Sequence, residues 1–163
     1  MDDVNLQLGK LLDQYDDKRR TVEARRQQVQ ADEDTYQKRF DALRTEVIGP
    51  VFEAVGAILK ARGHDFRISQ DEYAGESGGK TREAAISMHV IPAGLEKSQT
   101  DGPFPSLTFV TRHYNKTVCI RSSNAVPKLN GTASPRGDYQ LAQIDKELVQ
   151  VELLKLIAGI VNR

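Results

Sequence analysis

The sequence of 163 residues contains one cysteine, no tryptophan and no apolar run long enough to form a membrane-spanning helix. A single cysteine, Cys119, cannot form an internal disulfide bond, which excludes a secreted, disulfide-stabilised scaffold. A membrane span needs about 20 consecutive apolar residues. The acidic N-terminus, MDDVNLQLGK, lacks the apolar core of a signal peptide. We therefore expect a cytoplasmic protein with no membrane partner.

Net charge is also absent, because 23 Lys and Arg residues balance 23 Asp and Glu residues. This balance excludes a strong overall field that would attract a polyanion from a distance. The distribution is uneven, however, since residues 102–137 contain bases and no acid. We consider these bases a candidate surface for an anion or an acidic partner. The alternative is that they lie on both faces of a sheet and pair with nearby acids. The five bases are Arg112, Lys116, Arg121, Lys128 and Arg136.

Residues 10–48 contain no glycine and no proline, the two residues least compatible with a helix interior. Along this segment and just before it, apolar side chains recur every seven residues, the repeat of a coiled-coil helix. The pattern predicts a long, coiled-coil-like helix over residues 1–48 whose role is oligomerisation. The predicted oligomerisation residues are Leu8, Leu11, Tyr15, Val22, Val29, Tyr36 and Leu43.

The length of this helix favours self-association. Residues 10–48 would run about 58 Å as a helix, whereas a compact chain of this size has a diameter of about 39 Å. The apolar stripe therefore needs another helix, and we expect a homodimer. A parallel dimer in register would place Lys18 and Arg25 against their own copies. Antiparallel or staggered pairing, a different protein partner, a helical hairpin broken at Asp32, or folding back onto the rest of the chain are the alternatives.

Residues 49–163 predict a small α+β domain. Gly49-Pro50 should break or kink the long helix, and a shorter helix should follow and end at Gly63. Beyond Gly63 the apolar residues alternate at a period of two, which is typical of strands. Consecutive strands without helices between them favour an antiparallel sheet over a parallel one.

The alternation predicts a meander of about four strands, and a final helix packed on the sheet. Asp145 is expected to cap this helix, which runs through Val161. Asn115-Lys116 predicts a tight turn, and residues 124–137 predict a long polar loop. The four strands are predicted at residues 64–69, 84–91, 107–111 and 117–122, with a further short strand at residues 139–143.

Residues 74–81, AGESGGKT, match the pattern of a phosphate-binding loop. That loop joins a buried parallel strand to a helix, whereas the residues that follow this segment alternate like a strand. The segment is therefore better explained as a hairpin loop.

The residue types that carry catalysis or bind metals form no recognisable pattern. His64, His89 and His113 match no zinc-ligand spacing. Cys119 lies between Val118 and Ile120, which is typical of a small buried residue. We expect no enzymatic activity, no cofactor and no bound metal.

Two functions agree with these observations. The first is a non-enzymatic assembly protein that self-associates through its N-terminal helix and presents its α+β domain to a protein partner. The second is a dimeric nucleic-acid-binding protein that uses the acid-free region 102–137.

Overall fold

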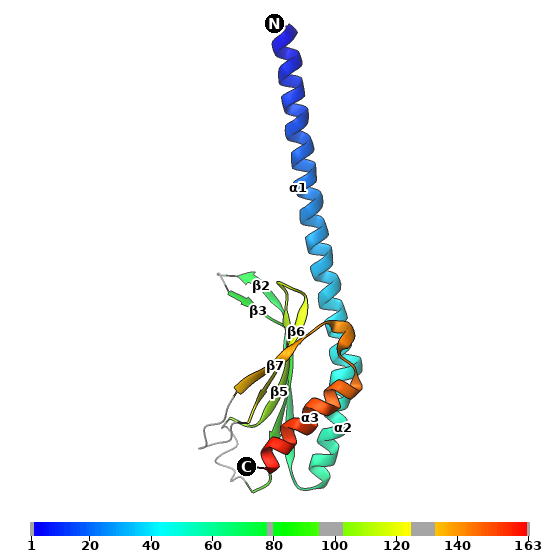
Figure 1. Ribbon diagram of the computed structural model, residues 1–163, viewed down its shortest axis with the longest axis vertical. Coiled ribbons are helices and arrows are strands. Elements are labelled where there is room, and N and C mark those ends of the chain that lie inside the picture. The colour runs from blue at the N-terminus through cyan, green and yellow to red at the C-terminus, as the bar shows by residue number, and fades with distance from the viewer. Residues whose placement is uncertain (1, 78–79, 95–102, 125–132, 163) are drawn as a thin grey trace. The chain divides into compact units, whose positions relative to one another are not determined.

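A computed structural model describes residues 2–77, 80–94, 103–124 and 133–162 (Figure 1). It confirms the α+β class, with an N-terminal helical segment, an antiparallel sheet and a C-terminal helix packed on that sheet. The chain divides into two units, residues 1–36 and 37–163, each described by itself. The first unit consists of one helix.

The N-terminal helix α1 runs from Asp2 to Leu43 and is followed without a break by a π-helical turn, η1, and by helix α2. The turn spans Arg44–Ile48 and α2 spans Gly49–Ala61. A complete break at Gly49-Pro50 is therefore excluded, although the shorter helix expected to follow is present. The helical hairpin with a break at Asp32 is wrong, because α1 continues through that residue. Pro50 occupies the first turn of α2, where its missing N–H costs little.

The π-helical turn explains how the chain passes this point. The Gly49 N–H donates to the Arg44 carbonyl, five residues back, so that one extra residue is accommodated in the turn. A Cβ at position 49 would lie 2.7 Å from the Arg44 carbonyl oxygen. Glycine therefore allows the helical path to continue where the sequence pattern predicted a break.

The main sheet has five antiparallel strands in the order β1-β4-β5-β6-β7. Strands β1, β4, β5 and β6 correspond to the four predicted strands, and β1 and β7 form the two edges. Lys116 has a φ of 56° in the predicted turn between β5 and β6. The five strands span Asp65–Asp71, Ala85–Ile91, Ser106–Arg112, Thr117–Ser123 and Ala133–Tyr139.

The fifth strand is not where the sequence pattern placed it. The prediction gave a loop over residues 124–137 and a strand over 139–143, whereas β7 is Ala133–Tyr139 and Leu141–Gln143 form a 3₁₀ turn, η3. The sequence of β7, ASPRGDY, contains proline and glycine and no β-branched residue. Proline is tolerated here because β7 is an edge strand, and its register shifts between the pairs Ile120–Gly137 and Arg121–Pro135.

The segment that resembles a phosphate-binding loop forms a two-stranded hairpin. Strand β2, Ala74–Ser77, pairs antiparallel with β3, Lys80–Arg82. No helix follows it, because the chain continues directly into β4. This confirms the interpretation of the segment as a hairpin.

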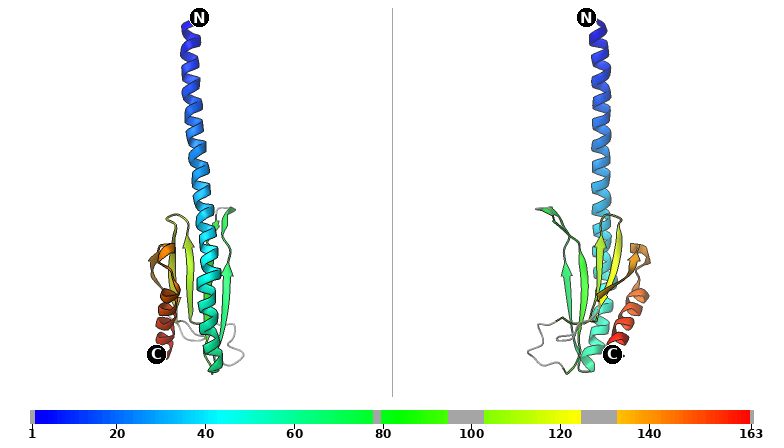
Figure 2. Two further views of the ribbon diagram at one scale, coloured as in Figure 1. Left: turned by 90° about the vertical axis from the view of Figure 1, so that its right-hand side faces the viewer. Right: turned by 60° about the vertical axis from the view of Figure 1, so that its left-hand side comes forward.

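Within the second unit, α2 and α3 lie on one face of the sheet, as both views in Figure 2 show. Helix α3 spans Lys146–Val161, and the predicted cap is confirmed because the Asp145 carboxylate accepts from the Leu148 N–H at 2.8 Å. The core lies between these helices and the sheet, and the rings of Phe52 and Phe109 meet there at 6.0 Å. The opposite face of the sheet carries no helix from the described part of the chain.

Helix α2 approaches the sheet closely at Gly56. A Cβ at this position would overlap the Phe66 ring on β1. Gly159 on α3 offers a matched comparison, since a Cβ there would meet nothing within 4 Å.

We therefore expect opposite effects from the same substitution at these two glycines. Gly56→Ala should lower the free energy of unfolding by about 1–3 kcal/mol, the usual cost of overpacking a core. Gly159→Ala should raise it by about 0.5–1 kcal/mol, because alanine costs less backbone entropy in a helix. Urea denaturation followed by circular dichroism would measure both, and equal effects would contradict the close approach of α2 to β1.

Candidate functional site

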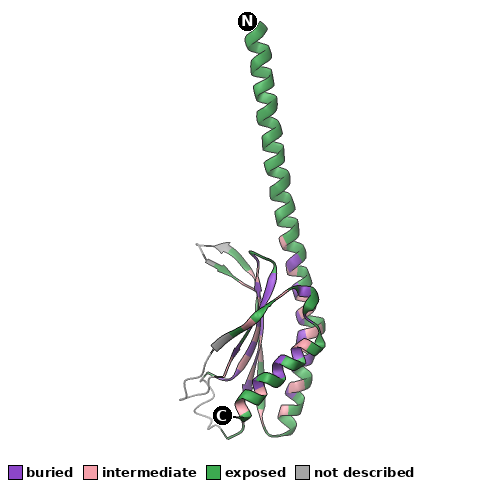
Figure 3. Cartoon of the chain, in the orientation of Figure 1, coloured by how far each residue is buried: buried purple, intermediate pink, exposed green. Residues whose placement is uncertain are grey.

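The predicted oligomerisation residues form an exposed apolar series along α1. Leu8, Leu11, Tyr15, Val22 and Val29 expose between 51% and 61% of their surface. Two further apolar residues on the same side of the helix, Val4 and Leu12, are exposed to a similar extent near the N-terminus, whereas Leu6 is exposed on the opposite side. Figure 3 shows the continuous exposure of this part of the helix. We call the seven side chains on this side, which exclude Leu6, the apolar stripe.

The last two predicted oligomerisation residues differ from the stripe. Tyr36 is only 3% exposed and Leu43 is half-buried. The seven-residue repeat alone could not reveal this difference, because it places all these residues on one side of the helix.

Polar side chains beside the stripe interact with one another along the helix. Gln28 donates to Asp32 at 2.9 Å and Gln30 donates to Asp34 at 3.0 Å. Arg20 also lies 3.6 Å from Asp17. Pairs with this spacing stabilise an exposed helix by only about 0.2–0.5 kcal/mol each. The polar surface of this segment therefore supports the helix weakly.

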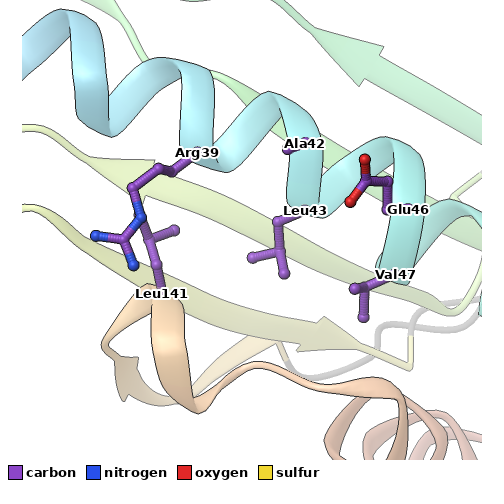
Figure 4. Close-up of a pocket in the computed structure, with 6 residues that line it drawn as sticks. All are labelled: Arg39, Ala42, Leu43, Glu46, Val47 and Leu141. Carbon is purple, nitrogen blue, oxygen red and sulfur yellow. The ribbon is translucent and has the colours of Figure 1, made fainter.

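A small groove of about 270 Å³, with four apolar and two charged lining residues, lies at the other end of α1, within the second unit (Figure 4). Arg39 extends beside Leu141 of η3, and Leu43 and Val47 project from the same side of the helix. Ala42 and Glu46 complete the lining. The short turn that supplies Leu141 is held by reciprocal bonds between Gln140 and Gln143. No sequence pattern indicates this groove, because it depends on the position of η3 in the fold.

Arg44 fixes the helix beside this groove to the sheet. Its side chain is 5% exposed, and its guanidinium donates to the carbonyls of Asp71 and Ala85 at 3.0 and 3.3 Å. It also lies 3.0 Å from the Glu72 carboxylate and over the Phe40 ring. The heptad pattern gave no signal for this residue, since a charged side chain in a long helix is usually exposed.

The five bases of region 102–137 do not all point to one face of the sheet. The register places Arg112 and Arg121 on the face that carries no helix. Arg136 instead lies 3.5 Å from Glu152, a 2% exposed residue of α3, and donates to Ser122 at 2.8 Å. Lys116 is exposed in the β5–β6 turn, and Lys128 lies outside the described residues.

Arg112 is held by several neighbours on the uncovered face. Its guanidinium donates to the Tyr114 hydroxyl at 3.1 Å and to the Cys119 sulfur at 3.3 Å. It also lies 3.4 Å from the Asp138 carboxylate. The hydrogen bonds to Tyr114 and Cys119 raise the pKa of Arg112 above its already high ordinary value. The buried position of Cys119 agrees with its expected role as a small core residue.

A shallow depression of about 550 Å³ lies on the same face. Its lining combines bases, hydroxyls and acids, so its charge is mixed rather than strongly positive. Arg121 and Arg112 contribute the bases, and Thr108 contributes a hydroxyl that bonds Ser87 at 2.8 Å. The acidic lining residues are Asp71 and Glu83.

Beside this depression, the buried imidazole of His113 pairs with the partly exposed carboxylate of Glu83, which was not a predicted site residue. The Glu83 carboxylate lies 2.5 Å from His113 Nδ1 and accepts from the Thr111 hydroxyl at 2.8 Å. The Tyr73 ring stacks on the imidazole at a centroid distance of 3.8 Å. The residues are distant in sequence, so no motif could have indicated the pair. These contacts hold the imidazole in one orientation.

Among the described residues, no group of three or more His, Cys, Asp or Glu side chains is placed to hold a metal ion. Nor does any described helix have a stretch both long and apolar enough to cross a membrane. Comparison of the chain with protein-family models, with curated proteins and with solved structures gives no significant match.

His89 lies on the uncovered face, where its Nε2 is 3.4 Å from the Ser69 hydroxyl. Partial burial lowers the pKa of His89 below its ordinary value, and the charge of Arg67, its register partner on β1, lowers it further. At pH values between the pKa of His89 in the folded chain and its pKa in the unfolded chain, the unfolded chain therefore binds more protons.

This difference predicts that the folded state loses stability as the pH falls below about 6.5, the ordinary pKa of histidine. His89→Gln should remove this contribution, so that the free energy of unfolding falls less between pH 7.5 and pH 5 than in the wild type. Denaturant unfolding at several pH values would measure the difference. Identical pH profiles for the two proteins would contradict the expectation.

Proposed function

We propose that this protein is a non-enzymatic assembly protein that forms a homodimer through the apolar stripe of α1 and presents its α+β unit to a protein partner. The observation that carries the proposal is the exposure of the stripe, in which each of the seven side chains is more than half exposed. Full burial of one such side chain contributes roughly 1.5–3 kcal/mol.

The first unit cannot cover this stripe itself. It consists of a single helix, and one helix has no second element on which to pack its apolar face. Helices in proteins draw most of their stability from such packing rather than from intrinsic propensity. A partner helix would therefore stabilise the segment as well as bury the stripe.

A second copy of the chain is the partner we favour. It supplies a helix of the same length with the same seven-residue repeat, as a two-fold symmetric interface requires. Burial of several stripe residues from each copy would exceed the roughly 4–15 kcal/mol cost of association. The uncovered sheet face of each copy is the surface that we propose to present to the protein partner.

Charging the centre of the stripe should prevent self-association. We expect the wild type to sediment as a dimer at micromolar concentration and the double variant Val22→Lys/Val29→Lys to sediment as a monomer, because two ammonium groups of each copy would have to be buried. Gln27→Lys is the control for an added base, since position 27 is exposed on the opposite side of the same helix. Sedimentation velocity would measure all three proteins.

A wild-type protein that stays monomeric throughout the micromolar range would overturn the proposed function. So would a dimer of unchanged affinity in the double variant, since the interface would then lie elsewhere.

Nucleic-acid binding by the dimer is the second candidate. It is favoured by Arg121 and Arg112, which line the depression on the uncovered sheet face with the Thr108 hydroxyl. Bases and hydroxyls of this kind suit contacts to phosphates. The acids in the same lining, Asp71 and Glu83, weaken the attraction and make this candidate the lesser one.

DNA binding, if it occurs, should depend on salt and on Arg121. Fluorescence anisotropy with duplex and single-stranded DNA should show affinity that falls with salt. In Arg121→Glu the affinity should be lower and the salt slope smaller by about 0.9 for each duplex phosphate that the arginine neutralises. Lys146→Glu provides the same charge change at an exposed position on α3. Absence of binding by the wild type at low salt would eliminate this candidate.

A further inference from the structure

The exposed apolar residues of α1 are unevenly distributed along the helix. Five of them, Val4, Leu6, Leu8, Leu11 and Leu12, crowd the N-terminal end. The middle of the helix exposes only one apolar side chain per seven residues. At the far end, the groove beside Leu43, Val47 and Leu141 provides a second apolar area. The two apolar areas thus lie at opposite ends of one helical segment.

The charges between the stripe residues oppose a parallel dimer. A coiled coil has two core positions in each seven-residue repeat. Along this part of α1 the first is apolar and the second is charged. The charged residues are Lys18, Arg25, Asp32 and Arg39. A parallel pair in register would place each of these side chains against its own copy. Like charges at core positions are costly, because each must be desolvated beside the other.

An antiparallel pair removes this conflict. When the two-fold axis of the dimer passes between Glu23 and Ala24, each charged core residue faces an apolar core residue of the other copy. The long aliphatic parts of lysine and arginine can then cover the apolar partner while the charge stays in water. The facing pairs are Leu8 with Arg39, Tyr15 with Asp32, Lys18 with Val29 and Val22 with Arg25.

The same pairing brings the crowded N-terminal end of one copy to the groove of the other. Val4 lies opposite Leu43, and Leu8 lies opposite Arg39. Both Leu43 and Arg39 line the groove. Leu43 is only half-buried and Ala42 is exposed, so both can contact a second helix. Tyr36 is buried and adds little to the contact, which leaves the groove as the apolar surface available at this end.

We infer that the two α1 helices of the dimer run antiparallel, with residues 4–12 of each copy docked in the groove formed by residues 39–47 and Leu141 of the other. This inference rests on the proposed self-association. It adds the direction of the helices, the register and a second contact surface. The arrangement is two-fold symmetric, so both grooves are filled and no apolar end is left over.

Disulfide trapping in the full-length chain tests the direction. Leu8→Cys and Arg39→Cys are made as separate, differently tagged variants, and each is studied alone and co-expressed with the other. Positions 8 and 39 are about 46 Å apart along one helix, too far for Leu8→Cys to bond to its own copy in an antiparallel dimer. We expect a covalent dimer only in the co-expressed pair, with one variant of each kind by mass spectrometry. Wild type is the control for Cys119, which is buried.

Tyr15→Cys with Asp32→Cys repeats the test closer to the centre. A covalent dimer of Leu8→Cys alone would overturn the antiparallel inference while leaving self-association intact. A dimer by sedimentation that traps neither mixed pair would also overturn it, because the register would be wrong. A monomeric wild type would instead remove the proposed function, and with it this inference.

The groove is tested separately by charging it. Ala42→Glu should weaken dimerisation at least tenfold, as measured by sedimentation equilibrium, whereas Ala57→Glu should leave the dissociation constant unchanged. Both alanines are exposed helical residues, but Ala57 lies on α2 and does not line the groove. An unchanged dissociation constant in Ala42→Glu would show that the groove takes no part in the dimer.

Discussion

The buried guanidinium of Arg44 is the contact on which the connection between helix and sheet depends. The π-helical turn places this side chain against the carbonyls of Asp71 and Ala85, where β1 ends and β4 begins. A guanidinium has five N–H donors, so it can satisfy several acceptors at once without leaving a buried polar group unpaired. The turn, the glycine that permits it and the arginine therefore act as one structural unit.

The position of this unit also determines what is available for association. Because the helical path continues from α1 into α2, Leu43 and Val47 remain on one helical surface beside η3. A break within Arg44–Ile48 would have separated these two side chains. The groove is thus a consequence of the π-helical turn as much as of the residues that line it.

Local signals predicted most of the fold. Asp145 marks the start of α3 because its side chain accepts a hydrogen bond from the first turn. Gly63 marks the end of α2 because glycine adopts a positive φ easily, and its φ is 89°. Alternating burial in β4 and β5 follows from which side chains face the helices. Strand β7 was misplaced because its pairing depends on β6 rather than on its own propensity.

The candidate surfaces were less predictable, because they depend on residues from distant parts of the chain. Tyr36 and Val29 occupy equivalent positions in the seven-residue repeat, yet only Val29 is exposed. Arg136 seemed to belong to a basic surface until the structure placed Glu152 of α3 beside it. The pairing of Glu83 with His113 similarly requires the register of the sheet. Sequence spacing cannot supply such relationships.

The two edges of the main sheet have a consequence for how copies of this chain can meet. An edge strand exposes unpaired backbone groups that can extend a sheet into a neighbouring molecule. In β7, Pro135 lacks a donor and the register shift disrupts the regular spacing of the remaining groups. In β1, the exposed charges of Asp65, Arg67 and Asp71 disfavour close approach of another strand. Both edges therefore discourage growth of the sheet into fibrous aggregates.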